Sequence, residues 1–195
     1  NVLDSRARRG GGLYVGGDAA PVLEDCVIRG NTALLHGGGG AWNTPASGRL
    51  VRGTIEENRA LAGGGLAVLR GEALVLEEVT LSDNAAGGSG GGVWVGAGAP
   101  ELLHCLLIGN HGGLAGGAAS IGGGSPRLVS CTLADNAAEA TGGVLVRGAT
   151  PLIDRTIVAF NTATAVAVQD GGRPVLTQSN LWGHPGGDWT GAIAE

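Results

Sequence analysis

The acidic residues of this chain are the type best suited to catalysis or to metal binding. Carboxylates that lie close together serve as general acids and bases or bind calcium. Three acids stand directly before an asparagine position: Glu57, Asp83 and Asp135. A second group stands elsewhere in the repeat: Glu24, Asp25, Glu77 and Glu78. Val51 and Arg52 fall between the acids of the second group. This spread is typical of solvated surface charge, so we predict no catalytic residue.

The three cysteines and four histidines could bind a metal, but their spacing matches no zinc motif. Cys26, Cys105 and Cys131 each stand five residues before an asparagine. In a stacked repeat this shared position points their Cβ atoms the same way, which is poor geometry for a disulfide. We predict buried free thiols that pack as small hydrophobic side chains, although whether Cys105 and Cys131 stay reduced is left open. No metal and no cofactor are expected.

An asparagine-centred repeat positions all these residues. Eight residues and three residues before each asparagine position, the side chain is aliphatic in all seven repeats. Runs of glycine precede short apolar segments such as 13–15 and 93–95, whose first and third residues are apolar, as in a strand with one buried face. A constant period of this size indicates a solenoid. The repeat positions lie 23 to 27 residues apart, and histidine takes the last one: Asn31, Asn58, Asn84, Asn110, Asn136, Asn161 and His184.

The repeat predicts an all-β fold, a right-handed parallel β-helix of about seven coils with three short strands in each coil. Such strands are stable when each pairs with the equivalent strand of the next coil, which stacks like residues in columns. We expect the asparagines at a corner with left-handed backbone, their amides hydrogen-bonded from coil to coil. Glycine is expected at a second corner. Residues 1–195 are expected to be one domain, a segment of a longer chain that is uncapped at both ends.

The pattern P-x-L-x-x-C-x-I-x-x-N-x-A, followed by a glycine run, resembles the right-handed β-helix repeats of the bacterial pectate-lyase-like superfamily. It is also similar to the repeats of polymorphic outer-membrane and surface proteins. The stretches that carry the resemblance are 21–33, 100–110, 126–138 and 151–163. The resemblance implies the fold across the whole chain, whereas no catalytic motif of those enzymes is matched.

Two outward features of the expected coils could bind something. The middle residue of the segment after each glycine run is expected to point outward, and three of the first four are aromatic: Tyr14, Trp42 and Trp94. They could stack on sugar rings or pack under a loop. The second feature is an outer face that turns apolar in the last four coils, at Leu103, Leu106, Ile108, Val129, Ala134, Ile157, Ala159 and Trp182. We expect another subunit, a flanking domain or an overlying loop to cover it.

Composition limits the classes of function. With 43% apolar residues and phased glycines, the chain can bury a core. The net charge is −5, and all 12 basic residues are arginine. Without a basic stripe, nucleic acid is not an expected partner. The one basic cluster, Arg6, Arg8 and Arg9, is expected in a solvated loop, and no apolar stretch reaches membrane-spanning length.

We therefore expect a non-catalytic scaffold or adhesion module, extracellular or on a bacterial cell surface, that presents a lateral face to a protein partner or a glycan. One alternative is a fragment or degenerate member of a β-helix family of polysaccharide lyases or glycoside hydrolases. Another is a subunit of a homopolymer that stacks end to end. The expected partners are a protein, a second copy bound through the apolar face or the open ends, or a polysaccharide.

Overall fold

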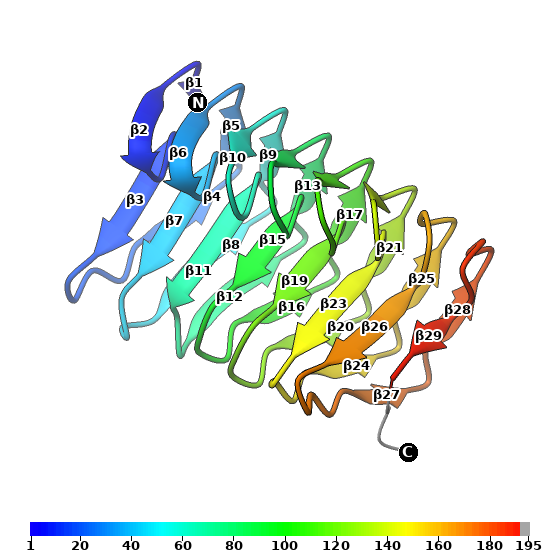
Figure 1. Cartoon of the computed structure of the whole chain (residues 1–195). Helices are drawn as coiled ribbons and strands as arrows, with labels where there is room; N and C mark the ends of the chain where they lie inside the picture. The colour runs from blue at the N-terminus through cyan, green and yellow to red at the C-terminus, as the bar shows by residue number, and fades with distance from the viewer. Residues whose placement is uncertain (192–195) are drawn as a thin grey trace.

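The computed structural model describes residues 1–191, and these consist of strands and turns without any helix. Each strand pairs in parallel with the equivalent strand of the neighbouring coil, which builds a parallel β-solenoid of about seven turns. Figure 1 shows the coils following one another from the blue N-terminal end to the red C-terminal end. We number the coils 1 to 7 by their asparagine-position residue, from Asn31 to His184. The predicted parallel solenoid is confirmed.

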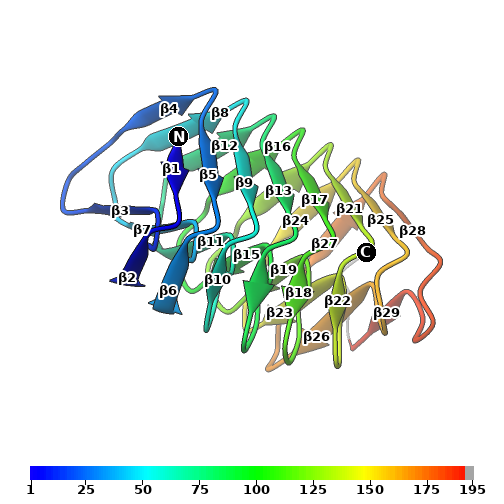
Figure 2. The same cartoon turned by 90° about the horizontal axis from the view of Figure 1, so that it is seen from above.

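Four parallel sheets run along the solenoid, and Figure 2 shows them from a second direction. Sheet A contains β1 (Val2–Leu3), β5 (Val27–Arg29), β9 (Thr54–Glu56), β13 (Thr80–Ser82), β17 (Leu106–Ile108), β21 (Thr132–Ala134), β25 (Ile157–Ala159) and β28 (Asn180–Trp182). Sheet B contains β2 (Arg6–Arg9), β6 (Thr32–His36), β10 (Arg59–Ala60), β14 (Ala85–Ala86), β18 (His111–Gly112) and β22 (Ala137–Ala138).

Sheet C contains β3 (Leu13–Gly16), β7 (Gly40–Asn43), β11 (Leu66–Arg70), β15 (Val93–Val95), β19 (Ala119–Ile121), β23 (Val144–Arg147), β26 (Val166–Gln169) and β29 (Trp189–Thr190). Sheet D contains β4 (Val22–Glu24), β8 (Gly48–Val51), β12 (Leu74–Glu77), β16 (Glu101–Leu103), β20 (Arg127–Val129), β24 (Leu152–Asp154) and β27 (Val175–Thr177).

The structure has about four strands in each coil, so the prediction of three was wrong. The additional strand is that of sheet B, which follows the asparagine directly. In coils 2 to 5 this strand is only two residues long. Two residues are too few to show an apolar alternation, so the segment reads as part of a turn.

The aliphatic positions of the repeat stack in columns and form the core. Leu81, Leu107, Leu133 and Val158 are register partners in sheet A, and all four are fully buried. The equivalent column of sheet D contains Leu76, Leu102, Leu128 and Ile153, also buried. Both predicted columns are therefore confirmed, and the hydrophobic effect holds the coils together along their whole length.

The corners differ from the prediction in one respect. The left-handed residue is the one before the asparagine, as at Glu57 and Asp83 (φ 56° and 54°), and the asparagine itself lies inside. The glycine corner is confirmed: Gly63 and Gly90 have φ of 66° and 72°. A Cβ atom at Gly63 would lie 2.4 Å from the backbone oxygen of Leu66, so only glycine fits.

Within residues 1–191 no helix is long and apolar enough to cross a lipid bilayer.

Candidate functional site

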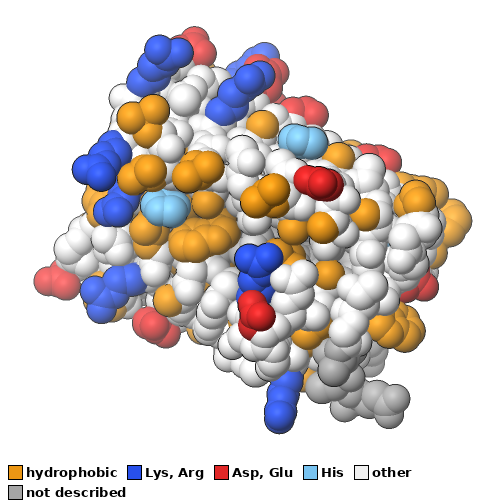
Figure 3. Space-filling view, viewed as in Figure 1, with side chains coloured by type: hydrophobic (Ala, Val, Ile, Leu, Met, Phe, Trp, Pro, Cys, Tyr) orange, Lys and Arg blue, Asp and Glu red, His pale blue; other side chains and the backbone are white. Residues whose placement is uncertain are grey.

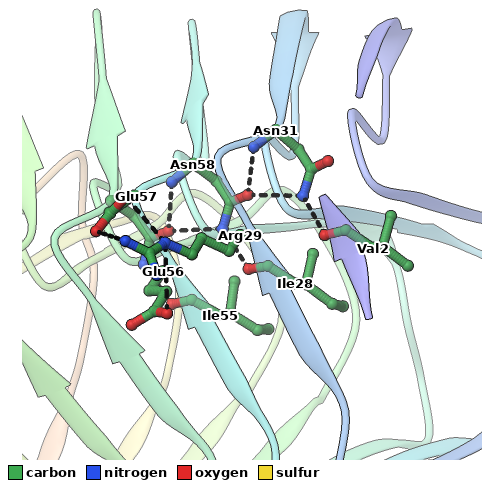
Figure 4. Close-up of polar contacts among 9 residues, drawn as sticks. Val2, Ile28, Arg29, Asn31, Ile55, Glu56, Glu57 and Asn58 are labelled. Carbon is green, nitrogen blue, oxygen red and sulfur yellow. Dashed lines mark hydrogen bonds and ion pairs between the residues drawn. The ribbon is translucent and has the colours of Figure 1, made fainter. Parts of the chain in front are cut away.

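The six asparagines form a continuous buried ladder. The backbone N–H and the Nδ2 of Asn58 both donate to Oδ1 of Asn84, at 3.1 and 3.0 Å, and Nδ2 also donates to the backbone oxygen of Ile28 at 2.9 Å. Figure 4 shows the same contacts one coil earlier, where Asn31 donates to Oδ1 of Asn58 and to Val2. All six side chains are fully buried, so the ladder fastens coil to coil and offers no group to a ligand.

His184 takes the seventh position of the column, as predicted, with different contacts. Its Nε2 lies 2.9 Å from the backbone oxygen of Val158, where an asparagine would place its Nδ2. Its Nδ1 lies 3.2 Å from the backbone oxygen of Asn161. An imidazole has no oxygen to offer the preceding coil, so the ladder ends here.

A second polar ladder runs through the position five residues before the asparagine. The backbone N–H of Cys131 donates to Oγ1 of Thr156 at 3.2 Å, and that of Thr156 donates to Oγ of Ser179 at 3.1 Å. Each side chain also donates to a carbonyl of the preceding coil, for example Thr156 to Leu128. Sequence reasoning noted the small size of these residues but missed their shared hydrogen-bonding role.

The three cysteines are free, and Cys105 and Cys131 are buried. Sγ of Cys131 donates to the backbone oxygen of Leu102 at 3.3 Å, so the thiol acts as a weak member of the second ladder. A hydrogen bond with Cys131, together with burial, raises the pKa of Cys105 far above its ordinary value. A thiol in this state is a poor nucleophile and a poor metal ligand.

The carboxylates of sheet D lie around a shallow hollow of about 330 Å³ that is lined by Val22, Glu24, Arg49, Val51, Arg52, Glu77 and Glu78. Arg52 of coil 2 donates to both oxygens of Asp25 at 3.0 and 3.2 Å, and Arg49 pairs with Glu77. The hydrogen bond with Asp25 raises the pKa of Arg52. Arginine thus stands between the acids of coils 1 and 3 and neutralises them.

The carboxylates before the asparagines do not meet. Glu57 is held by Arg29 at 2.8 Å on the exposed corner, as Figure 4 shows, while Asp83 and Asp135 point to solvent. In the part of the chain that the structure describes, no three histidine, cysteine or acidic side chains gather closely enough to bind a metal ion.

The expected aromatic track is broken because Trp42 points inward. Its register partners are Val15 and Val68 of the core, and its side chain is fully buried. The run Gly37–Gly40 explains the error, since its last glycine already belongs to β7 and shifts the strand by one residue. The indole lies over Gly48, where a Cβ would come within 2.2 Å of Cζ2. The prediction that Trp42 faces outward was wrong.

Tyr14 and Trp94 do lie in the outward column of sheet C. Tyr14 is 47% exposed and accepts a hydrogen bond from Nδ2 of Asn43 at 2.9 Å. Trp94 is half-buried and stacks on His36 with ring centroids 5.2 Å apart. The rings of Trp94 and His36 meet over β11, which lies between β7 and β15 in sheet C. This contact accounts for the complete burial of Ala67, whose side chain is on the outward side of β11.

The apolar outer face is only partly available. Leu103, Leu106, Ile108 and Ala134 are half-buried, and Val129 and Ala159 are buried. Ile157 and Trp182 remain 45% and 53% exposed, and Thr132 interrupts the surface between Leu106 and Ile157. An overlying loop was one of the expected covers, and within residues 1–191 no loop shields Ile157 or Trp182.

Phe160 enlarges this face and was not predicted as part of it. It is 51% exposed and packs edge-on against Trp182, with ring centroids 4.6 Å apart. Its backbone has φ of 54°, a conformation that a bulky side chain rarely adopts. The signal was present in the sequence, because Phe160 stands where other coils have glycine or an acid.

The basic cluster also differs from expectation. Arg6, Arg8 and Arg9 belong to the strand β2 and are exposed, whereas a solvated loop was predicted. Arg6 is the register partner of Thr32, which in turn pairs with Arg59. Sheet B therefore presents several arginines on one face.

In comparisons with protein family models, curated proteins and solved structures, no match to this chain was found. The geometry described above is therefore the basis for any assignment of function.

Proposed function

We propose that this chain is a non-catalytic β-solenoid scaffold, extracellular or on a bacterial cell surface, that docks a protein partner through the lateral face of coils 4 to 7. The observation that carries the proposal is the exposed apolar group of Ile157, Phe160 and Trp182. Aromatic side chains with this exposure are typical anchors of protein interfaces. A right-handed winding, as in pectate-lyase-like repeats, belongs to the same proposal because crossovers between parallel strands are nearly always right-handed.

The backbone at Phe160 supports a functional role for this side chain. A left-handed conformation at a residue with a Cβ costs about 1–2 kcal/mol. Glycine occupies the equivalent position in coils 1, 4 and 7, at Gly30, Gly109 and Gly183. Coil 6 keeps a large exposed aromatic ring where glycine would relieve strain, and such strain clusters at binding sites.

The ion pairs of sheet D argue against the polysaccharide-cleaving alternative. A general acid needs a carboxyl group whose proton affinity suits the reaction, and a metal site needs carboxylates that are free to bind. Asp25 and Glu77 instead each hold an arginine. We therefore favour the scaffold role over an enzymatic activity.

Glycan binding is the second candidate, and the exposed ring of Tyr14 favours it. Trp94 lies in the same outward column, three strands further along sheet C, or about 14 Å away. This span suits a short oligosaccharide more than a single sugar. Binding on a glycan array that Tyr14→Ala abolishes and Tyr14→Phe retains would support this candidate, while an array without hits would remove it.

Site-specific photo-crosslinking in cells that naturally produce the chain tests the scaffold proposal. A photo-reactive phenylalanine analogue replaces Phe160 or Trp182, and the matched control replaces Val22, which is 61% exposed on sheet D. We expect a discrete protein adduct from positions 160 and 182, in the surface or secreted fraction, and none from position 22. The same adducts from position 22, or none from any position, would overturn the proposal.

A further inference from the structure

Sheet B carries an exposed surface that is separate from the lateral face. We call it the Leu–Arg face and define it by Leu34, Leu61, Leu114, Arg6, Arg8, Arg9 and Arg59. Figure 3 shows hydrophobic and basic side chains side by side over the N-terminal half of the molecule in the view of Figure 1. The arginines lie on β2 and β10. Leu34 lies on β6, Leu61 directly follows β10, and Leu114 comes two residues after β18.

The three leucines are among the most exposed apolar side chains of the chain, at 73% for Leu34, 52% for Leu61 and 60% for Leu114. Backbone hydrogen bonds link the latter two through Gly88, whose N–H donates to Leu61 and whose oxygen accepts from Leu114. Leu34 lies one coil before Leu61, on the adjacent strand β6. The leucines therefore form a line along the long axis that is interrupted in one coil, where Gly87 and Gly88 take their place. Single exposed leucines are ordinary, but a line of them marks a contact surface.

The arginines of this face differ from those of sheets A and D in their partners. Five arginines on sheets A and D or at their corners each have a carboxylate within 4.0 Å: Arg29, Arg49, Arg52, Arg127 and Arg155. Within residues 1–191, Arg6, Arg8, Arg9 and Arg59 have none. The same holds for three arginines on or after strands of sheet C, namely Arg70, Arg147 and Arg173. Carboxylates occur only at the margins, at the corner with sheet A and beyond β22: Asp4, Glu57, Asp83, Asp135 and Glu139.

In a chain with net charge −5, four of the seven arginines without a carboxylate partner thus lie around the exposed leucines. Aliphatic side chains do not stack on sugars, so a polysaccharide fits the arginines but leaves the leucines in water. Anionic lipid headgroups satisfy the guanidinium groups, and the acyl boundary just beneath accepts the leucines. Between Arg6, Thr32 and Leu34 lies an open hollow of about 440 Å³, wide enough for a headgroup phosphate.

We propose that the Leu–Arg face binds peripherally to the surface of an anionic lipid bilayer. The solenoid lies with its long axis along the membrane, with the leucines at the acyl boundary and the arginines at the phosphates. Sheets A and D then remain accessible from the aqueous side. This inference does not depend on the proposed partner of the lateral face, which lies on a different sheet.

Vesicle co-sedimentation of the full chain tests the proposal. The probes are vesicles of phosphatidylcholine with one third phosphatidylglycerol, and vesicles of phosphatidylcholine alone. The triple variants Leu34→Ser/Leu61→Ser/Leu114→Ser and Arg6→Gln/Arg8→Gln/Arg9→Gln are each expected to weaken binding to the anionic vesicles about tenfold or more, because acyl contact and headgroup attraction both contribute. Wild-type binding to phosphatidylcholine alone should be weak.

Matched controls remove the same number of exposed groups from other sheets. Leu3→Ser/Val22→Ser/Ile157→Ser and Arg49→Gln/Arg127→Gln/Arg155→Gln are expected to change binding less than about twofold, since these residues are outside the face. Circular dichroism confirms that each variant is folded. Three results would each overturn the proposal. They are an equal loss of vesicle binding in the control variants, vesicle binding that the leucine variant does not weaken, and a native mass of a dimer that the leucine variant converts to a monomer.

Discussion

Asn136 donates from Nδ2 to Oδ1 of Asn161 at 2.9 Å, and this amide-to-amide bond is the last of the ladder. The backbone N–H of Asn136 donates to the same oxygen, also at 2.9 Å. From Asn58 onward each amide oxygen thus accepts twice from the preceding coil, whereas that of Asn31 accepts once, from the backbone N–H of Ser5. Each Nδ2 reaches back to a carbonyl. The ladder is directional, so the loss of one member leaves two N–H donors unpaired on the preceding coil and removes one of the two donors to the amide oxygen of the following coil.

Asn110→Ala is expected to destabilise the protein by at least about 3 kcal/mol, because each buried polar group left without a partner costs about 1–3 kcal/mol. The backbone N–H and one Nδ2 hydrogen of Asn84 lose their acceptor, while the oxygens of Leu81 and Asn136 each lose one donor. Urea unfolding followed by circular dichroism measures the loss. Asn180→Ala is the matched control, since Asn180 is exposed on β28. Equal midpoints for the two variants would contradict a structural role of the ladder.

His184→Asn is expected to stabilise the protein by about 1 kcal/mol, the net contribution of a typical hydrogen bond. An asparagine would restore an oxygen for the backbone N–H and Nδ2 of Asn161, while its own Nδ2 would replace Nε2 at the backbone oxygen of Val158. Thermal unfolding provides the measurement, with His111→Asn on the exposed side of β18 as the control. A lower melting temperature for His184→Asn would show that the imidazole is the better terminus.

The columns of the fold were predictable because the same type of side chain recurs at each column position in seven successive repeats. Leu81 and Leu107 occupy the same place in successive coils, and only stacking buries both. The ladder followed from the same logic, since a buried amide at a fixed position needs a partner in the next coil. The polar hydrogen bonds of Cys131, Thr156 and Ser179 were not evident, because three residue types share one role and their common property in the sequence is only small size.

The surface was harder to predict because one residue of register reverses a side chain. Trp42 turned inward because Gly40 takes the first position of β7, which no pattern of apolar residues could reveal. Phe160 and the leucines of sheet B were missed for another reason. They are not repeated in every coil, so a pattern built from the positions that all coils share does not include them.

Trp42→Ala is expected to cost about 3–5 kcal/mol, as large-to-small changes in a packed core do. The indole fills the space that a side chain at Gly48 would occupy, and its Cδ1 lies near Gly71. Trp42→Phe should cost much less, because Nε1 has no hydrogen-bond partner to lose. Trp182→Ala is the exposed control, with an expected loss of about 1 kcal/mol or less. Urea unfolding that ranks Trp182 above Trp42 would contradict the burial.

One of the three thiols is expected to react with Ellman's reagent in the folded protein at pH 8, and all three after unfolding in urea. Cys26 is half-buried, whereas Cys105 and Cys131 are buried. The hydrogen bond with Cys131 and the burial that raise the pKa of Cys105 also keep thiolate from forming there. Cys26→Ser should abolish the fast phase. Two or more fast thiols in the wild-type protein would show that the interior opens readily.

The imidazole of His36 is expected to make the protein less stable in mild acid. Burial, with a smaller effect of Arg9, lowers the pKa of His36 below its ordinary value of 6.5. Below about pH 6.5 the unfolded chain therefore takes up a proton that the folded protein refuses, and the free energy of unfolding falls with pH until the folded pKa is reached. Above about pH 6.5 the contribution of His36 is fully present.

His36→Leu removes this dependence and keeps an apolar side chain against Trp94. Urea unfolding of both proteins at pH 8, 7, 6 and 5 isolates the effect, because every other titrating group is common to the two. We expect the wild-type protein to lose more stability than the variant between pH 7 and 5, and the same amount between pH 8 and 7. Parallel curves over the whole range would mean that His36 is protonated as easily in the folded protein as in the unfolded chain, and that its stack on Trp94 tolerates the charge.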